Sequence, residues 1–303
     1  LLTKGKLNMR RILLSSVALA SLIVAMPAHA ELEVTLGGDL AFRAGFMDND
    51  LANGSDRDFT SESNLFLNAH GTTSNGLEYG AAITLNTSTS DSANAKRTYV
   101  YAQGRWGRVE LGDQDGASEL GLYAPTVGVG QIDGAVQDFI PFADRVDTTG
   151  DRGDANFKPL DSFRATKATY YTPVFAGFQA GVSYAPEWDS NASGEGVEFN
   201  DDAGQGRNVV ELAARYDVDL SGVKLGVSGQ YNFGEGVDMG GFSSENLQAW
   251  GLGARLSYKG FTFGGGYTHD GNSFNNKAAV DDNVTSWNLG ATYEQGPWGV
   301  GVS

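Results

Sequence analysis

The chain contains no cysteine, little proline and few basic residues. Without cysteine it has neither a disulfide framework nor a thiolate metal site. Its 7 prolines contrast with 42 glycines, and 11% of its residues are aromatic, which favours many strands and tight turns over helices. The formal net charge of −16 argues against nucleic acid as a partner, because phosphate binding requires a basic surface.

An apolar run near the N-terminus has the features of an export signal. The basic start at 9–11 precedes apolar residues 12–26, and Ala28 and Ala30 form a small-residue cleavage site. The run is too short and wrongly flanked for a membrane anchor. We therefore expect an upstream extension at 1–8, a signal peptide at 9–30 cleaved between Ala30 and Glu31, and one domain at 31–303.

From residue 31 onward, apolar and polar residues alternate with a period of two, in segments of about ten residues. This is the length that a tilted membrane strand requires. Short turns alternate with longer polar loops, and aromatic residues gather at strand ends, a pattern typical of an outer-membrane β-barrel. The alternative is a soluble β-solenoid or sandwich in the periplasm. The predicted strands are 33–47, 64–71, 77–87, 97–103, 108–112, 164–174, 179–184, 209–216, 223–233, 247–258, 261–268, 284–293 and 299–303.

The stretch 113–161 departs from this alternation. It carries too much apolar surface for a disordered linker, and a loop of this length in a compact protein is usually functional or disordered. We predict a loop that packs against the protein and presents carboxylates. Its acidic residues are Asp113, Asp115, Glu119, Asp133, Asp138, Asp144, Asp147, Asp151, Asp154 and Asp161, against the basic Arg145, Arg152 and Lys158.

The segments that flank this stretch resemble Gram-negative general porins, most closely their alphaproteobacterial (Rhodobacter-type) branch. The run YVYAQGRWGRVELGDQDG at 99–116 is similar to the strand–turn–strand before that family's constriction loop. The run YYTPVFAGF at 170–178 resembles the strand that leaves the loop, and 31–47 resembles the first strand. The resemblance implies an all-β, transmembrane antiparallel barrel of sixteen strands, with 113–161 as its inward-folded third loop.

The resemblance also implies a homotrimer in the outer membrane, surrounded by lipid and lipopolysaccharide. The chain departs from the family at its end, where Gly301-Val302-Ser303 stands in place of a terminal aromatic residue. Bacterial barrels close with an even number of strands, whereas the alternation gives twelve and the start of another. We therefore expect a C-terminally truncated barrel of about twelve to thirteen strands.

The parity of each strand predicts which side chains face the lumen. Charged residues belong inside, because an arginine facing lipid at the midplane costs about 2–4 kcal/mol. We predict a basic wall of Arg43, Arg97 and Arg108 opposite the loop acids, and such rings of charge set ion preference. Alternatively, the arginines form salt bridges to the loop for rigidity, and both roles can coexist. The predicted constriction acids are Asp113, Asp115, Glu119, Asp133, Asp138, Asp144 and Asp147.

Metal, cofactor and catalytic sites are only weakly indicated. Asp113, Asp115 and Gly116 resemble the start of a calcium loop, but the other ligands of that pattern are missing, so Ca²⁺ is a weaker alternative to solvated carboxylates. After the signal, the histidines are His70 and His269, and neither forms a recognisable hydrolase pattern. We predict no enzyme and no cofactor.

These features predict a general diffusion channel that passes small hydrophilic solutes and ions, with cation preference from the acidic loop. One alternative is a substrate-selective channel with a row of aromatic or basic side chains along its lumen. Another is a structural or adhesive barrel with a plugged lumen. An outer-membrane hydrolase is disfavoured by the scarcity of histidine.

Overall fold

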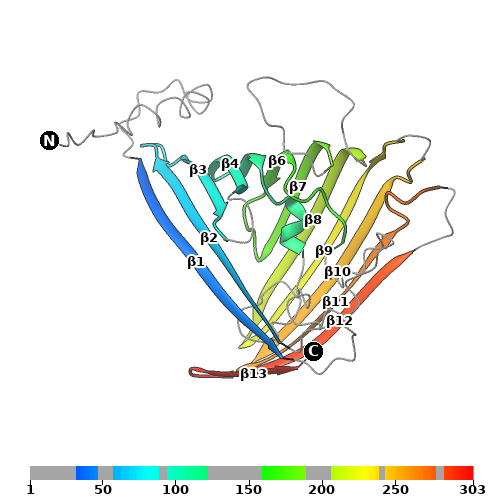
Figure 1. Cartoon of the computed structure of the whole chain (residues 1–303). Helices are drawn as coiled ribbons and strands as arrows, with labels where there is room; N and C mark the ends of the chain where they lie inside the picture. Colours follow the sequence, from blue (N-terminus) through cyan, green and yellow to red (C-terminus); the bar gives the residue numbers. More distant parts are fainter. Residues whose placement is uncertain are drawn as a thin grey trace.

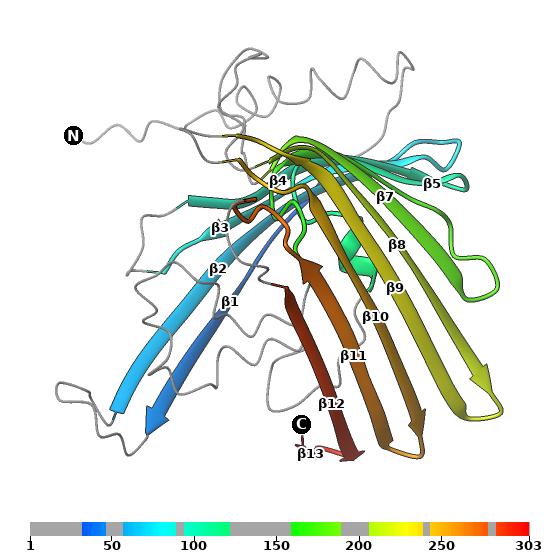
Figure 2. The ribbon, with the colours of Figure 1, turned by 90° about the vertical axis from the view of Figure 1, so that its right-hand side faces the viewer.

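The computed structural model describes residues 32–46, 57–88, 94–121, 159–188, 206–238, 243–277 and 283–302. Within these ranges the chain forms one antiparallel sheet of 13 strands, in which each strand pairs with its neighbours in sequence. The sheet curves strongly around a concave inner face (Figures 1 and 2). The predicted all-β, antiparallel, barrel-type architecture is thus confirmed.

The strands are β1 (Glu33–Phe46), β2 (Arg57–Thr72), β3 (Glu78–Asn86), β4 (Asn94–Gly104), β5 (Gly107–Asp113), β6 (Thr166–Tyr171), β7 (Phe178–Glu187), β8 (Gly206–Leu220), β9 (Val223–Gly236), β10 (Leu247–Tyr258), β11 (Phe261–Gly271), β12 (Val284–Gln295) and β13 (Trp298–Val302). A short 3₁₀ helix, η1 (Ala117–Gly121), follows β5. In the part of the chain that the structure describes, no helix has the length and apolarity needed to cross a membrane.

Each predicted segment contains a strand, but most bounds differ by one to four residues and the start of β2 differs by seven. β2 begins at Arg57 because β1 offers it a partner along its whole length, from Glu33 opposite His70 to Phe46 opposite Arg57. β6 ends at Tyr171, before Pro173, which has no N–H to donate to the ladder. β8 continues to Leu220, beyond the predicted 216.

The turn after β8 explains its greater length. Only Ser221 and Gly222 separate β8 from β9, and their φ angles are 58° and 93°. Positive φ at both central residues is the geometry of a two-residue hairpin whose twist matches the flanking strands. Asp217 and Asp219 therefore lie in the strand, where Asp219 faces Lys224 across the ladder. The sequence alone suggested that these acids belonged to the turn.

The two faces of the sheet differ in chemistry, as the alternation predicts. Large apolar side chains such as Leu36, Leu252 and Leu289 are exposed on the convex face. On the concave face, Val209, Leu247 and four further apolar residues form a buried cluster with Leu160, which lies outside the strands. An apolar outer face is what a barrel presents to lipid, so the segment that contains Leu160 packs on the lumen side.

Candidate pore constriction

The structure describes both ends of the predicted constriction loop. We name residues 114–121 the incoming stem and residues 159–165 the outgoing stem. The incoming stem contains η1, which packs against β6, β7, β8, β9 and β10 inside the curve of the sheet (Figure 2). Leu160 and Ala165 of the outgoing stem belong to the buried cluster on the same face. Both ends of the loop are therefore held on the lumen side.

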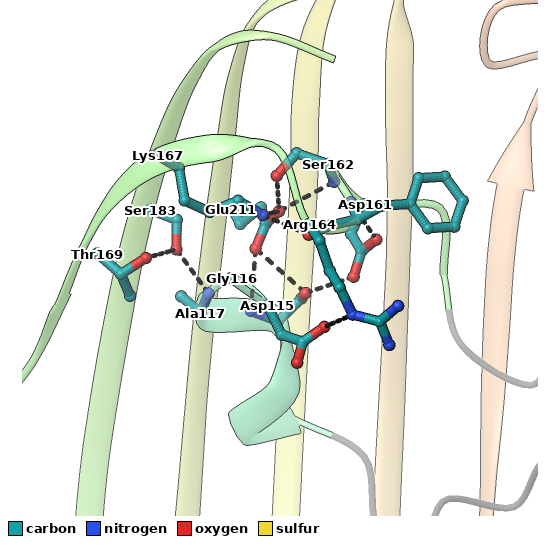
Figure 3. A network of polar contacts seen from close by, with 12 residues as sticks. Asp115, Gly116, Ala117, Asp161, Ser162, Arg164, Lys167, Thr169, Ser183 and Glu211 are labelled. Atoms are coloured by element: carbon teal, nitrogen blue, oxygen red, sulfur yellow. Dashed lines mark hydrogen bonds and ion pairs between the residues drawn. The ribbon is translucent and has the colours of Figure 1, made fainter. Parts of the chain in front are cut away.

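One carboxylate connects the neighbouring strand β4 with both stems. Arg97, on β4, forms an ion pair with Asp115 of the incoming stem. Arg164 of the outgoing stem places its Nε 3.4 Å from Asp115 Oδ1 (Figure 3). The side chains of Arg97 and Arg164 are 41% and 45% exposed, against 18% for Asp115. Two guanidinium groups thus share one carboxylate.

Arg108 is held in place by neighbouring side chains of β4 and β5. It forms an ion pair with Glu110, two residues away on the same face of β5. Its Nη1 donates to Gln103 Oε1 at 3.1 Å. Its guanidinium carbon lies 3.9 Å from the ring centroid of Tyr101, a cation–π distance. Of the two wall arginines whose side chains are described, Arg97 thus pairs with a carboxylate of the loop and Arg108 with a carboxylate of its own strand.

The other predicted constriction residues are placed only in part. Asp113 occupies the face of β5 that Leu111 shares, and its carboxylate accepts a hydrogen bond from Thr166. Glu119 lies exposed on η1. Arg43 lies opposite Thr60 in the β1–β2 ladder, but its side chain is outside the described part. Four predicted acids fall outside the described residues altogether: Asp133, Asp138, Asp144 and Asp147.

Sequence reasoning missed Glu211, a buried residue on β8. Its Oε1 accepts hydrogen bonds from the backbone N–H of Ser162, at 3.0 Å, and from the Ser162 hydroxyl. Its Oε2 accepts from Ser118 N–H at 3.3 Å and lies 3.2 Å from the Ser118 hydroxyl. The Nζ of Lys167 is 3.5 Å from Oε1, and neither side chain is exposed to solvent (Figure 3).

A glycine makes room for this carboxylate. A Cβ built on Gly116 would lie 1.7 Å from Glu211 Oε2, well inside any tolerated contact. Beside it, the Ala117 N–H donates to Ser183 Oγ at 2.6 Å, and that hydroxyl lies 2.9 Å from Thr169 Oγ1. The incoming stem thus crosses from β5 to β7 and β8 in close backbone contact with the wall.

The outgoing stem has further anchors of its own. Asn232, on β9, donates to Leu160 O at 3.0 Å, and Leu160 N–H donates to Asp270 Oδ1 at 2.7 Å. The Trp188 indole donates to Asp161 O at 2.7 Å. The Trp188 ring also packs on Phe274, with ring centroids 4.9 Å apart. Strands β9 and β11 and the end of β7 therefore all hold this stem.

Two loops at the rim reached by the ends of β9 and β11 are joined to each other. Ser244 and Asn276 form an isolated antiparallel bridge. Asp238 accepts hydrogen bonds from the Ser243 hydroxyl at 2.9 Å and the Ser244 N–H at 3.1 Å. These bonds lower the pKa of Asp238 from its ordinary value, so the stability that they contribute is present at neutral pH and is lost as the pH falls through that lowered value. Across the described segments, no group of three or more His, Asp or Glu side chains could hold a metal ion.

Comparisons with known proteins agree with this architecture. A family described as Gram-negative porin matches residues 15–303. A porin of Rhodobacter capsulatus is 38% identical over 101 residues, which is 33% of this chain and 31% of that protein. An uncharacterized protein of Rickettsia conorii is 24% identical over 74% of this chain and 66% of its own length. The chain thus spans less than two thirds of the length of these curated relatives.

Solved structures show the same fold. The anion-selective porin from Comamonas acidovorans superimposes with a TM-score of 0.56 at 21% identity, over 87% of this chain and 74% of that one. A porin structure refined at 1.8 Å resolution gives a TM-score of 0.53 at 20% identity, over 89% of this chain and 82% of that one. At such identities the likeness concerns the fold alone.

Proposed function

Because the chain belongs to the Gram-negative porin family, we propose that it forms a general diffusion channel for small hydrophilic solutes and ions, with a preference for cations. Members of this family are outer-membrane β-barrel channels, and the chain is therefore an outer-membrane barrel protein and not an enzyme. We further propose that it assembles as a homotrimer in contact with outer-membrane lipid and lipopolysaccharide.

The observation that carries the proposal is the position of the two stems on the concave face. Ser118 Oγ of the incoming stem lies 2.9 Å from Asp161 Oδ2 of the outgoing stem, so the acid-rich segment between them begins and ends in the lumen. A narrowing lined by charged side chains selects ions by sign. The excess of carboxylates in 113–161 and the net charge of −16 favour cations.

A substrate-selective channel is the second candidate, and the Arg97–Asp115–Arg164 group favours it. The two guanidiniums are about half exposed and carry one positive charge more than the carboxylate between them. The Phe163 ring beside Arg164 is 39% exposed. Basic and aromatic side chains at one point of the lumen would retard an anionic solute and allow it to block the current.

The reversal potential of the channel in a potassium chloride gradient distinguishes these functions. We expect potassium to be about 2- to 10-fold more permeant than chloride, as for pores lined by carboxylates. Asp115→Asn should shift the preference toward chloride, because it releases Arg97 and Arg164 from their shared partner. The control is Glu294→Gln, which removes the same charge next to the β12–β13 turn.

Chloride preference in the unmodified channel would overturn the cation preference. Saturable block by one anionic solute would support the selective channel instead. Swelling of proteoliposomes in sugars of graded size completes the test: swelling that falls smoothly with solute size is expected for an open pore, and its absence would identify a plugged barrel.

A further inference from the structure

The two stems of the constriction loop meet at a single side chain of the wall. Ser118, on the incoming stem, and Ser162, on the outgoing stem, bond to different oxygens of the Glu211 carboxylate. Ser183 bonds to the incoming stem alone and Asn232 to the outgoing stem alone, while the Ser118–Asp161 and Asp115–Arg164 contacts join the stems to each other. Glu211 thus fixes the distance between the two stems as well as their distance from β8.

The carboxylate is suited to this role because it is a fully occupied acceptor in a dry site. Two backbone N–H groups, two serine hydroxyls and the Lys167 ammonium surround it, and its exposed fraction is 0%. Hydrogen bonds to an ionised acceptor are stronger than those between neutral groups. An amide in its place would turn an NH₂ group toward donors and leave at least one of them unpaired.

Lys167 ties the arrangement to β6. Its Nζ donates to Phe163 O at 2.6 Å and faces Glu211 Oε1. The Ser118 hydroxyl lies within hydrogen-bond distance of both Glu211 and Asp161, so it can donate to either. Wall and stems therefore form one connected network across β6, β7 and β8.

We propose that Glu211 is a positioning residue for the constriction: by clamping both stems, it holds the loop at a fixed place in the lumen and keeps the pore at one conductance. This rests on the channel function proposed above. Without the clamp, the stems lose the buried wall carboxylate that they share. They remain joined to each other by the Ser118–Asp161 and Asp115–Arg164 contacts, but they can move away from β8. The pore should then be wider on average and should fluctuate.

Single-channel recording of Glu211→Gln tests the proposal. We expect the mean conductance to rise roughly twofold and the open-channel current noise to rise several-fold more, since pore diameter at the constriction governs ion flow. Glu235→Gln is the matched control, because Glu235 lies on the next strand and pairs with Arg207 in an exposed ion pair. It should leave both quantities unchanged. Only channels that show the strand content of the parent by circular dichroism are compared.

A covalent substitute for the clamp provides the second measurement. The chain has no cysteine, and a Cβ built on Gly181 lies 3.1 Å from Ala117 Cβ, slightly inside the separation that a disulfide spans. The Leu120 and Tyr171 side chains, each 2.9 Å from that Cβ, must shift to admit it. In Ala117→Cys/Gly181→Cys/Glu211→Gln, oxidation should restore the conductance and low noise of the parent, and a reducing agent should remove them again.

Each result is informative. An unmodified protein that does not conduct would contradict the channel function itself. A conducting parent with an unchanged Glu211→Gln variant would overturn the clamp. If the current noise of the Glu211→Gln channel stays high after the disulfide has formed, Glu211 acts by some route other than holding the stem. That result also overturns the proposal.

Discussion

Replacing Lys167 with methionine is expected to lower the free energy of unfolding by about 3–5 kcal/mol, the usual cost of removing one partner from a buried ion pair. Neither Lys167 nor Glu211 is exposed, so water cannot solvate the carboxylate that remains. The substitution also removes the donor that Phe163 O accepts from. Methionine keeps most of the volume of lysine, which limits the change to charge and hydrogen bonding.

Urea-induced unfolding of the protein in lipid vesicles, followed by tryptophan fluorescence, measures this effect. Lys224→Met is the control, because Lys224 is exposed on β9 and should change stability by less than about 0.5 kcal/mol. Equal stability of Lys167→Met and the control would contradict the buried pair.

Replacing Leu67 with arginine is expected to destabilise the barrel by about 2–4 kcal/mol, the cost of a lipid-facing arginine near the midplane. Leu67 lies well inside β2, between Leu36 of β1 and Ile83 of β3, in a row of apolar side chains on the convex face. The arginine would have to leave this row or draw water into the hydrocarbon.

The adjacent residue provides a matched control. Asn68 faces the concave side between Thr35 and Ala82, so Asn68→Arg places the same side chain in the lumen. It should cost little stability. The same unfolding measurement compares both variants, and if Asn68→Arg proves the more damaging of the two, the assignment of faces is inverted.

Much of the fold could be predicted from the sequence because a barrel strand obeys a simple local rule. The alternation in β9 and β12 places Leu225 and Leu289 on the outer face, whatever the rest of the chain does. Strand ends were harder to predict. The length of β2 depends on the partner that β1 offers, and the turn after β8 depends on the backbone angles of Ser221 and Gly222.

The site was less predictable, because it depends on contacts between distant segments. The sequence suggested that a wall arginine would face a loop acid, and the structure brings Arg97 and Asp115 together. Which acid meets which arginine could not be deduced, because the path of the loop is not a local property. Glu211 was missed although its parity places it inward. The sequence did contain one indication, since Glu211 stands between the apolar residues Val209 and Ala213 on the same inner face, where the structure buries all three.

The clamp at Glu211 also constrains the order in which the protein can assemble. Its bonds to Ser118 and Ser162 close intervals of 93 and 49 residues, whereas the hairpins form between neighbours in sequence. Long intervals carry a larger entropic cost of closure and are closed late unless other contacts shorten them. The wall from β6 to β8 must therefore exist before the loop can be fastened to it. In refolding experiments, a change in Trp188 fluorescence later than strand formation would report this final step.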